Sequence, residues 1–372
     1  MNKLIFSIVF CLLLLKGIEL PAQSLRFKTV LDNPNSLIVD MKQDKLGFFW
    51  LLTNTSGLQK FDGVKIQSFL NDPGNPNSIS SGQVSSLIID ADNIIWLGIH
   101  GSGLDRLDPS TNTFTHFRHN PTDGFSLGND TVNTILEDHS GNLWIGTNQG
   151  LDLLDRKTGT FTHYSNKNND PDGNSYPQVF KIYEDRNGIL WIYGRSSAKD
   201  HISPGALNRF DPITIKFTPY FQDPAKANNG IPAKFIKDIY EDSKNNFWIV
   251  TDAGLYAMDR NTGKCTRYYP DPFNSSTLSQ SPVAKAAVSD IMFVTEDSSG
   301  AFWVGMGEKG LNRYDPVTKT SMHFGVFYDF LLVSASNKMD TATGLNIPFI
   351  INGVSSKDGL FWVLGLGGLS QL

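Results

Sequence analysis

The side chains best suited to binding a ligand stand in segments of irregular length in the second half of the chain. They combine aromatic rings with cationic and neutral hydrogen-bond donors, and they are Arg195, Lys199, His201, Tyr220, Phe273, Phe327 and Tyr328. Aromatic faces beside hydrogen-bond donors suit flat polar ligands such as sugars, or a protein partner anchored by aromatic residues. We predict these seven residues to be ligand-binding. The alternative is that their segments have no binding role and only extend from the fold or pack on a neighbouring domain.

Sequence signatures of catalysis, nucleotide binding and metal binding are missing. The chain contains no His-Glu-x-x-His, Gly-x-Ser-x-Gly, Walker or Rossmann pattern. Residues 170–174 resemble a calcium loop but lack the glutamate that would complete one. His116, His163 and His323 fall at the same place in different repeats, so we expect them to lie far apart. We predict a non-enzymatic chain with no catalytic residue, no cofactor and no metal site.

The elements that position these side chains belong to a repeated unit. All seven tryptophans recur in one phrase, at intervals of 46, 48, 47, 57, 55 and 59 residues: Trp50, Trp96, Trp144, Trp191, Trp248, Trp303 and Trp362. The phrase has an acidic residue, small or polar residues, an apolar residue, tryptophan and a second apolar residue. Such self-similarity indicates an array of seven structural repeats.

The third unit shows what one repeat contains. Short runs with strand character, separated by turn residues rich in glycine and asparagine, cover Thr131–Asp138, Leu143–Asn148, Gly150–Asp155 and Thr160–Tyr164. Four short antiparallel strands in about 45 residues are typical of a propeller blade. We therefore predict an all-β fold, a seven-bladed β-propeller of four-stranded antiparallel blades.

Aspartate stands six residues before the tryptophan in six of the seven units. These residues are Asp44, Asp90, Asp138, Asp185, Asp242 and Asp297, and Ser356 takes their place in the last unit. Metal binding is one interpretation. We predict instead that each aspartate caps a hairpin by accepting backbone N–H groups. The tryptophans, one per unit at a fixed strand position, are predicted to pack blade against blade.

The seventh unit has only three strands, at Phe349–Val354, Phe361–Gly365 and Gly368–Leu372. At the other end of the chain, Ser24–Val30 resembles the fourth strand of other units. We predict that this N-terminal strand completes the seventh blade and closes the ring, which removes exposed sheet edges. The alternative is a fragment cut in mid-repeat, and both hold if a longer protein carries its first propeller here.

The first 22 residues have the pattern of a secretory signal peptide. A positive end at Lys3 precedes the apolar run Leu4–Leu15, and a cleavage site of the expected kind follows at Ala22. A retained N-terminal anchor is the alternative. We predict a mature chain of residues 23–372 that is periplasmic, with no membrane insertion. Cys265 is its single cysteine, and the net charge of -5 argues against nucleic acid as a partner.

In this sequence the two faces of such a propeller differ in the lengths of their connections. Turns between strands one and two and between strands three and four share one face, and they are short and uniform. The other connections share the second face and carry nearly all the length variation, including the predicted ligand-binding residues. A second candidate site is the mouth of the central channel, near Tyr176, Lys181, Lys237 and Asp238.

The pattern Asp-x-x-Gly-x-Leu-Trp-Ile-Gly-Thr-x-x-Gly-Leu, found at Asp138–Leu151, resembles the repeat of two-component regulator propellers. The other good copies are Asp44–Leu58, Asp90–Leu104 and Asp297–Leu311. The resemblance covers essentially all of the predicted mature chain. It implies the periplasmic sensor region of a hybrid two-component histidine kinase of Bacteroidetes type, which detects glycan fragments. Members of the family usually carry two propellers, an immunoglobulin-like domain, a membrane helix, and kinase, receiver and DNA-binding regions. This chain departs from them by stopping after seven units.

We therefore predict a sensing or interaction module rather than a catalyst. Its expected partners are an oligosaccharide ligand and, in a longer protein, a second propeller, downstream sensor domains and a homodimer partner. Two alternatives stay open. One is a propeller enzyme of the lyase type, for which His201 is the one histidine in the long loops. The other is a scaffold that docks a second propeller without a small ligand.

Overall fold

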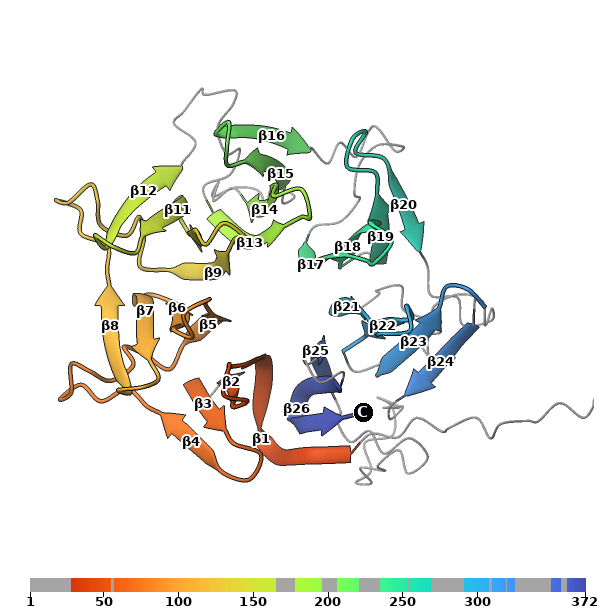
Figure 1. The fold of residues 1–372 in the computed structure, drawn as a ribbon, viewed down its shortest axis with the longest axis horizontal. Coiled ribbons are helices and arrows are strands. Elements are labelled where there is room, and N and C mark those ends of the chain that lie inside the picture. The colour runs from red at the N-terminus through yellow and green to blue at the C-terminus, as the bar shows by residue number, and fades with distance from the viewer. Residues whose placement is uncertain are drawn as a thin grey trace, which may run out of the picture.

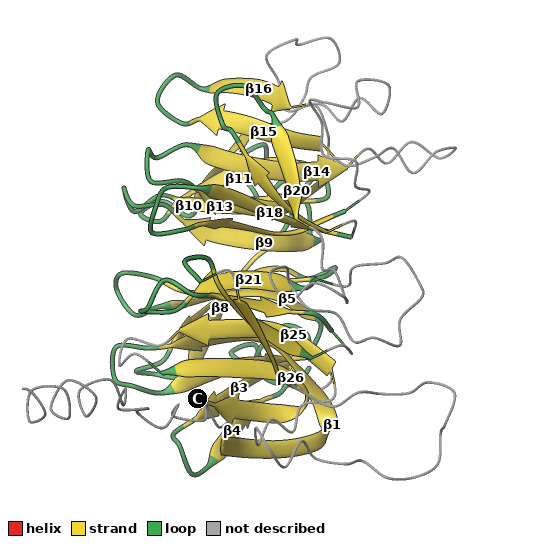
Figure 2. Ribbon diagram, turned by 90° about the vertical axis from the view of Figure 1, so that its right-hand side faces the viewer, coloured by secondary structure: helices red, strands yellow, loops and turns green. Residues whose placement is uncertain are grey.

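The computed structural model describes residues 28–54, 57–164, 178–195, 206–220, 235–252, 254–268, 291–307, 310–318, 320–324, 349–355 and 360–372. Throughout these ranges the chain forms strands, turns and irregular segments, and it has no helix. The strands make seven blades around a central axis (Figure 1). Seen from the side, short hairpin turns project from one face of the ring, which we call the turn face (Figure 2). The predicted all-β, seven-bladed architecture is confirmed.

Six blades take four strands in chain order, from the axis outward, and blade seven takes its outer strand from the N-terminal end. Blade one has the second half of β1 (Lys28–Gln43), β2 (Phe49–Thr53), β3 (Gly57–Phe61) and β4 (Ile66–Phe69). Blade two has β5 (Val84–Ile89), β6 (Ile95–Ile99), β7 (Gly103–Asp108) and β8 (Thr113–Phe117). Blade three has β9 (Val132–Glu137), β10 (Leu143–Thr147), β11 (Gly150–Asp155) and β12 (Thr160–Tyr164). These last bounds lie within one residue of those predicted for the third unit.

The remaining blades repeat the pattern. Blade four has β13 (Gln178–Glu184), β14 (Leu190–Arg195), β15 (Ala206–Asp211) and β16 (Lys216–Tyr220). Blade five has β17 (Ile236–Glu241), β18 (Phe247–Thr251), β19 (Gly254–Met258) and β20 (Cys265–Tyr268). Blade six has β21 (Phe293–Glu296), β22 (Phe302–Gly305), β23 (Leu311–Asp315) and β24 (Thr320–Phe324). Blade seven has β25 (Phe349–Ser355), β26 (Phe361–Gln371) and the first half of β1.

The two ends of the chain close the ring through β1. Its first half pairs with β26, from Lys28 opposite Gln371 to Leu37 opposite Leu366, and its second half pairs with β2. β26 folds back on itself, because Phe361 and Leu372 exchange backbone hydrogen bonds, and so it supplies strands two and three of blade seven. One six-stranded sheet, in the order β25-β26-β1-β2-β3-β4, therefore joins the last blade to the first. The predicted closure by an N-terminal strand is confirmed.

The tryptophans pack one blade against the next, as predicted. Trp144 meets Phe210 of blade four at a ring-centroid distance of 5.5 Å, and Trp303 stacks on Phe361 of blade seven at 4.7 Å. Each lies in an apolar cluster that takes residues from two neighbouring blades. Burial of a large aromatic ring at every such boundary supplies much of the apolar area that holds the blades together.

The repeated aspartates cap their hairpins, and they also bind the tryptophans. In blade three, Asp138 Oδ1 accepts the backbone N–H groups of Ser140 (3.0 Å) and Asn142 (2.8 Å). Its second oxygen, Oδ2, accepts the indole N–H of Trp144 at 2.8 Å. The indole contact recurs at Asp44, Asp90, Asp185, Asp242 and Asp297. One carboxylate thus fixes both the turn and the ring that packs on the next blade.

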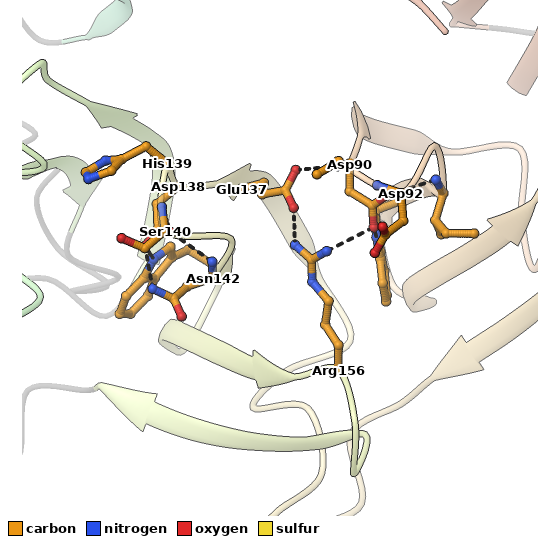
Figure 3. A network of polar contacts seen from close by, with 12 residues as sticks. Asp90, Asp92, Glu137, Asp138, His139, Ser140, Asn142 and Arg156 are labelled. Carbon is orange, nitrogen blue, oxygen red and sulfur yellow. Dashed lines mark hydrogen bonds and ion pairs between the residues drawn. The ribbon is translucent and has the colours of Figure 1, made fainter. Parts of the chain in front are cut away.

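Glutamates tie consecutive blades together on the turn face. Glu137 Oε2 accepts the backbone N–H of Ala91 from blade two at 2.9 Å. The same bond joins the next three boundaries, through Glu184, Glu241 and Glu296. Arg156 adds a second connection, because it binds Glu137 of its own blade and Asp90 of blade two (Figure 3). These charged side chains at the boundary are therefore paired across it.

Ile215, in the β15–β16 turn of blade four, has a φ of +56°. Other blades place Asn112, Gly159 or Gly263 at this left-handed position. A β-branched residue there is strained by about 1–2 kcal/mol. We expect Ile215→Asn to raise the free energy of unfolding by about 1 kcal/mol in urea denaturation. Ile213, 91% exposed in the same turn without a positive φ, is the control, and an equal gain from Ile213→Asn would contradict the strain argument.

Candidate functional site

The first strand of every blade borders the central channel (Figure 1). In six of these strands, those of blades one to five and blade seven, the pairing with strand two shifts near the start of the strand. In blade four the shift falls between Val179 and Lys181, and in blade five between Ile236 and Asp238. A bulge of this kind re-aims the side chains beside it. Polar side chains at this level can therefore turn toward the channel.

In the six bulged strands, the residue ten places before the tryptophan lies at the bulge. Going round the ring, this position holds Asp40, Ser86, Thr134, Lys181, Asp238, Phe293 and Asn352. Six of the seven are polar, although the neighbouring positions pack in the apolar core. Polar groups persist at such a place only if they have partners or water.

Charged side chains from different blades meet at this level. Lys181 Nζ of blade four lies 2.7 Å from Asp238 Oδ1 of blade five. On the other side of the ring, Asn352 Nδ2 donates to Asp40 Oδ1 at 3.3 Å, and Lys42 Nζ lies 3.4 Å from the same oxygen. We call Asp40, Lys42, Lys181, Lys237, Asp238 and Asn352 the channel cluster.

Asp40 and Lys181 influence one another although their blades are not neighbours. Desolvation opposes the charge on Lys181, but the carboxylates of Asp238 and Asp40 outweigh it, so the pKa of Lys181 is raised. The side chains of Lys181 and Asp238 stay 36% and 23% exposed, so the pair is open to solvent. An ammonium and a carboxylate that keep contact with water can exchange that water for a polar ligand.

Lys237 contributes a further positive charge to the channel cluster. Its Nζ lies 3.5 Å from Met292 Sδ, and a thioether is a weak acceptor. No carboxylate pairs with Lys237 among the residues described. The cluster contains three lysines and two aspartates, a net charge of +1. It can donate to oxygen atoms of a ligand through its lysines and accept from hydroxyl groups through its carboxylates.

The second candidate site predicted from the sequence is partly assembled here. Lys181 and Asp238 form the ion pair, and Lys237 is the next residue along β17. Tyr176 lies outside the described residues. Asp40, Lys42 and Asn352 were not predicted. Comparing the units at the position ten residues before each tryptophan would have found Asp40 and Asn352.

Most of the first candidate site lies beyond the described residues. Lys199, His201, Phe273, Phe327 and Tyr328 fall outside them, and Arg195 is described only as the last backbone position of β14. Tyr220 is placed at the boundary between blades four and five. Its hydroxyl donates to the Arg260 carbonyl at 2.6 Å, and its ring lies 5.2 Å from that of Trp191. These contacts within the fold occupy both its ring and its hydroxyl.

Two pairs, each of a buried aspartate and a partly exposed histidine, were missed in the sequence. Asp105 Oδ1 lies 2.7 Å from His116 Nδ1, whose other nitrogen is 2.9 Å from the Pro76 carbonyl oxygen. Ser80 lies beside this pair, and serine, histidine and aspartate together are the residue types of a hydrolase triad. Its hydroxyl, however, donates to Asp105 rather than to the histidine. The pair anchors the link between blades one and two. The sequence signal that could have found both pairs is the recurrence of Asp and His at matched positions. Asp105 and His116 of blade two correspond to Asp152 and His163 of blade three.

The second pair predicts a pH dependence. The hydrogen bond that His163 Nδ1 donates to Asp152 Oδ1, at 2.8 Å, raises the pKa of His163 above its ordinary value, and desolvation only partly opposes it. A raised folded-state pKa gives stability that is fully present below the unfolded pKa of about 6.5 and is lost as pH rises through the folded value. We expect an NMR titration of His163 to give a pKa above 6.5. His163→Gln should remove this part of the pH dependence of unfolding, and a wild-type pKa at or below 6.5 would contradict it.

No group of three or more His, Cys, Asp or Glu side chains among the described residues could hold a metal ion. No helix in this part of the chain is long and apolar enough to cross a membrane.

Comparison with known proteins identifies the repeat. The family model described as two component regulator propeller matches residues 126–149 and 230–253. Both stretches contain the Asp-to-Trp phrase, around Trp144 in blade three and Trp248 in blade five. Among curated proteins, none matches this chain in sequence.

Solved structures share the fold. The extracellular domain of the hybrid two component system BT3049 from B. thetaiotaomicron has a TM-score of 0.70 at 22% identity, over 93% of this chain and 41% of its own. That of BT4673 from the same organism has a TM-score of 0.54 at 19% identity, over 91% and 47%. Virginiamycin B lyase from Staphylococcus aureus, at 12% identity, has a TM-score of 0.60 over 93% and 98%. The chain thus spans less than half the length of the two extracellular domains. Two of its units match the two component regulator propeller model, and they belong to a seven-bladed β-propeller.

Proposed function

We propose that this propeller is the ligand-sensing part of a longer two component signalling protein and acts in the periplasm. The observation that carries the proposal is the family repeat, found in a chain whose fold matches extracellular domains named as two component systems. The proposed partners within the longer protein are a second propeller, downstream sensor domains and a homodimer partner. The proposed role is binding rather than catalysis.

We propose an oligosaccharide as the ligand and the channel cluster as the floor of its site. The lysines and carboxylates of the cluster supply the donors and acceptors that sugar hydroxyl groups require. Of the residues predicted in the long loops, Arg195, Lys199, His201, Phe273, Phe327 and Tyr328 are proposed to contact the ligand above this floor. Tyr220 is left out because its ring and hydroxyl contact Trp191 and Arg260.

The test is thermal unfolding of the chain against a panel of plant, algal and host oligosaccharides. A ligand that binds the native state raises the melting temperature in a saturable way. We expect one class of glycan to do so, and Lys181→Met combined with Asp238→Asn to weaken its binding about tenfold or more, because two polar contacts are lost. Lys157→Ala, an exposed lysine on the turn face, is the matched control.

A chain that folds and is shifted by no glycan in the panel would refute direct sugar binding and favour the scaffold alternative. A shift that the double variant leaves intact would keep sugar binding but remove the channel cluster from the site. Loss of binding in Lys199→Ala and His201→Ala, with the channel variant unaffected, would place the ligand in the long loops.

A further inference from the structure

A cleft of about 870 Å³ opens between blades four and five. Its walls come from the β13–β14 turn of blade four and from the β17–β18 and β19–β20 turns of blade five. These hairpin turns lie on the turn face (Figure 2), whereas Lys181 and Asp238 of the channel cluster lie at bulges near the opposite ends of β13 and β17. The cleft is therefore distinct from the channel cluster.

The carboxylates of the cleft already have partners. Asp185 accepts the Trp191 indole N–H at 2.9 Å and pairs with Arg260 at 3.3 Å through the same oxygen. Its other oxygen accepts two backbone N–H groups of its own turn. The backbone N–H of Asn261, at 2.9 Å, is the main cause that lowers the pKa of Asp259. Both acids thus accept hydrogen bonds from donors within the fold.

Three cationic side chains line the cleft beside the two carboxylates. Arg260 is occupied, because it binds Glu241 at 2.8 Å and Asn245 at 2.7 Å as well as Asp185. Arg209 and Lys264 also line the cleft. Within the described part of the chain, neither of their charged groups forms an ion pair or a hydrogen bond. The charged groups of Arg209 and Lys264 therefore stay available at a cavity large enough for a small organic molecule.

The boundary between blades two and three shows what is special here. It has the same connection, with Arg156 between Glu137 and Asp90 in place of Arg260 between Glu241 and Asp185 (Figure 3). Arg106 occupies the strand position of Arg209. The position of Lys264, however, is Thr160 in blade three, and Phe161 stands where blade five has Cys265. Blade five thus adds a cation and removes a large side chain at this boundary.

We propose that the cleft between blades four and five binds an oxyanion, the carboxylate, sulfate or phosphate group of a polar organic ligand, through Arg209 and Lys264. Guanidinium and ammonium groups form charge-assisted hydrogen bonds with such oxygens, and a planar Arg side chain can hold two of them at once. The Arg260 network fixes one wall, so the site is formed before the ligand arrives.

The test is isothermal titration calorimetry of the purified chain with citrate, sulfate and phosphate at low ionic strength. We expect saturable binding of at least one anion, which salt weakens. Arg209→Ala and Lys264→Thr should each weaken it about tenfold, because each removes one charged contact. Arg106→Ala, the matched position in blade two, should leave it unchanged. Melting temperatures of all three variants establish that they fold.

The choice among the three anions identifies the group: binding of citrate alone indicates a carboxylate ligand, and binding of sulfate or phosphate indicates a sulfated or phosphorylated one. The absence of saturable binding of any anion up to about 10 mM would overturn the proposal. So would equal weakening by Arg106→Ala, since binding would then reflect general surface charge. The glycan test of the channel cluster is unaffected by either result.

Discussion

Removing the residues before Asn35 is expected to open the ring and to lower the free energy of unfolding by about 3–5 kcal/mol. The first half of β1 is the outer strand of blade seven and pairs with β26. Val30 and Leu31 pack against the cluster that contains Trp362 and Leu369. Their loss exposes this apolar surface and an unpaired strand edge, which favours aggregation. Urea denaturation and size-exclusion chromatography measure both effects.

A chain that begins at Lys28 is the control, because it keeps the whole pairing between β1 and β26. We expect it to unfold as one cooperative unit, whereas the shorter chain unfolds earlier and over a wider range of urea. A synthetic peptide of residues 23–36 should restore stability by adding its strand to the free edge. Equal stability of the two truncated chains would show that β1 does not lock the ring.

The second large effect is expected from Asp138→Ala, which should cost about 3–4 kcal/mol. Asp138 is buried and accepts hydrogen bonds from Ser140, Asn142 and the indole of Trp144. Removing the carboxylate leaves the buried indole N–H and two turn N–H groups without an acceptor. The loss then spreads to the next blade, because Trp144 packs on Phe210. Urea denaturation followed by tryptophan fluorescence measures it.

Asp155 gives the matched control for this prediction. It also accepts backbone N–H groups within a hairpin turn, at Lys157 and Thr158, but it is exposed and bonds no tryptophan. Asp155→Ala is therefore expected to have a much smaller effect. If both substitutions cost the same, the turn rather than the indole contact would account for the stability, and the double role of the repeated aspartates would be wrong.

The architecture could be predicted from the sequence because each unit contains the residues that specify its own strands and turns. The spacing of Asp138 and Trp144 and the turn residues between them predicted the strands of blade three within one residue. The capping role of the aspartates was also predicted correctly. The indole bond was not, because a spacing of six residues does not tell whether an N–H will point at a carboxylate. That depends on how far the hairpin twists before β10 begins.

Less of the candidate site than of the fold could be predicted from the sequence. Lys181 and Asp238 are 57 residues apart, and their contact depends on the bulges that turn them toward the channel. The cleft depends on substitutions within an otherwise constant repeat, where Lys264 and Cys265 replace Thr160 and Phe161. Comparison of the units position by position can detect such departures. It cannot tell which of them border a cavity.

The glutamate bonds on the turn face also bear on how such a ring could grow. Glu137 is the acceptor that binds blade two, and the backbone N–H of His139 is the donor that binds Glu184 of blade four. Acceptor and donor thus flank the same aspartate, so one short stretch carries both halves of a head-to-tail joint. A duplicated unit would therefore contain the residues that bind both of its neighbours. Blade number in such a protein can therefore change by gene duplication without the invention of a new interface.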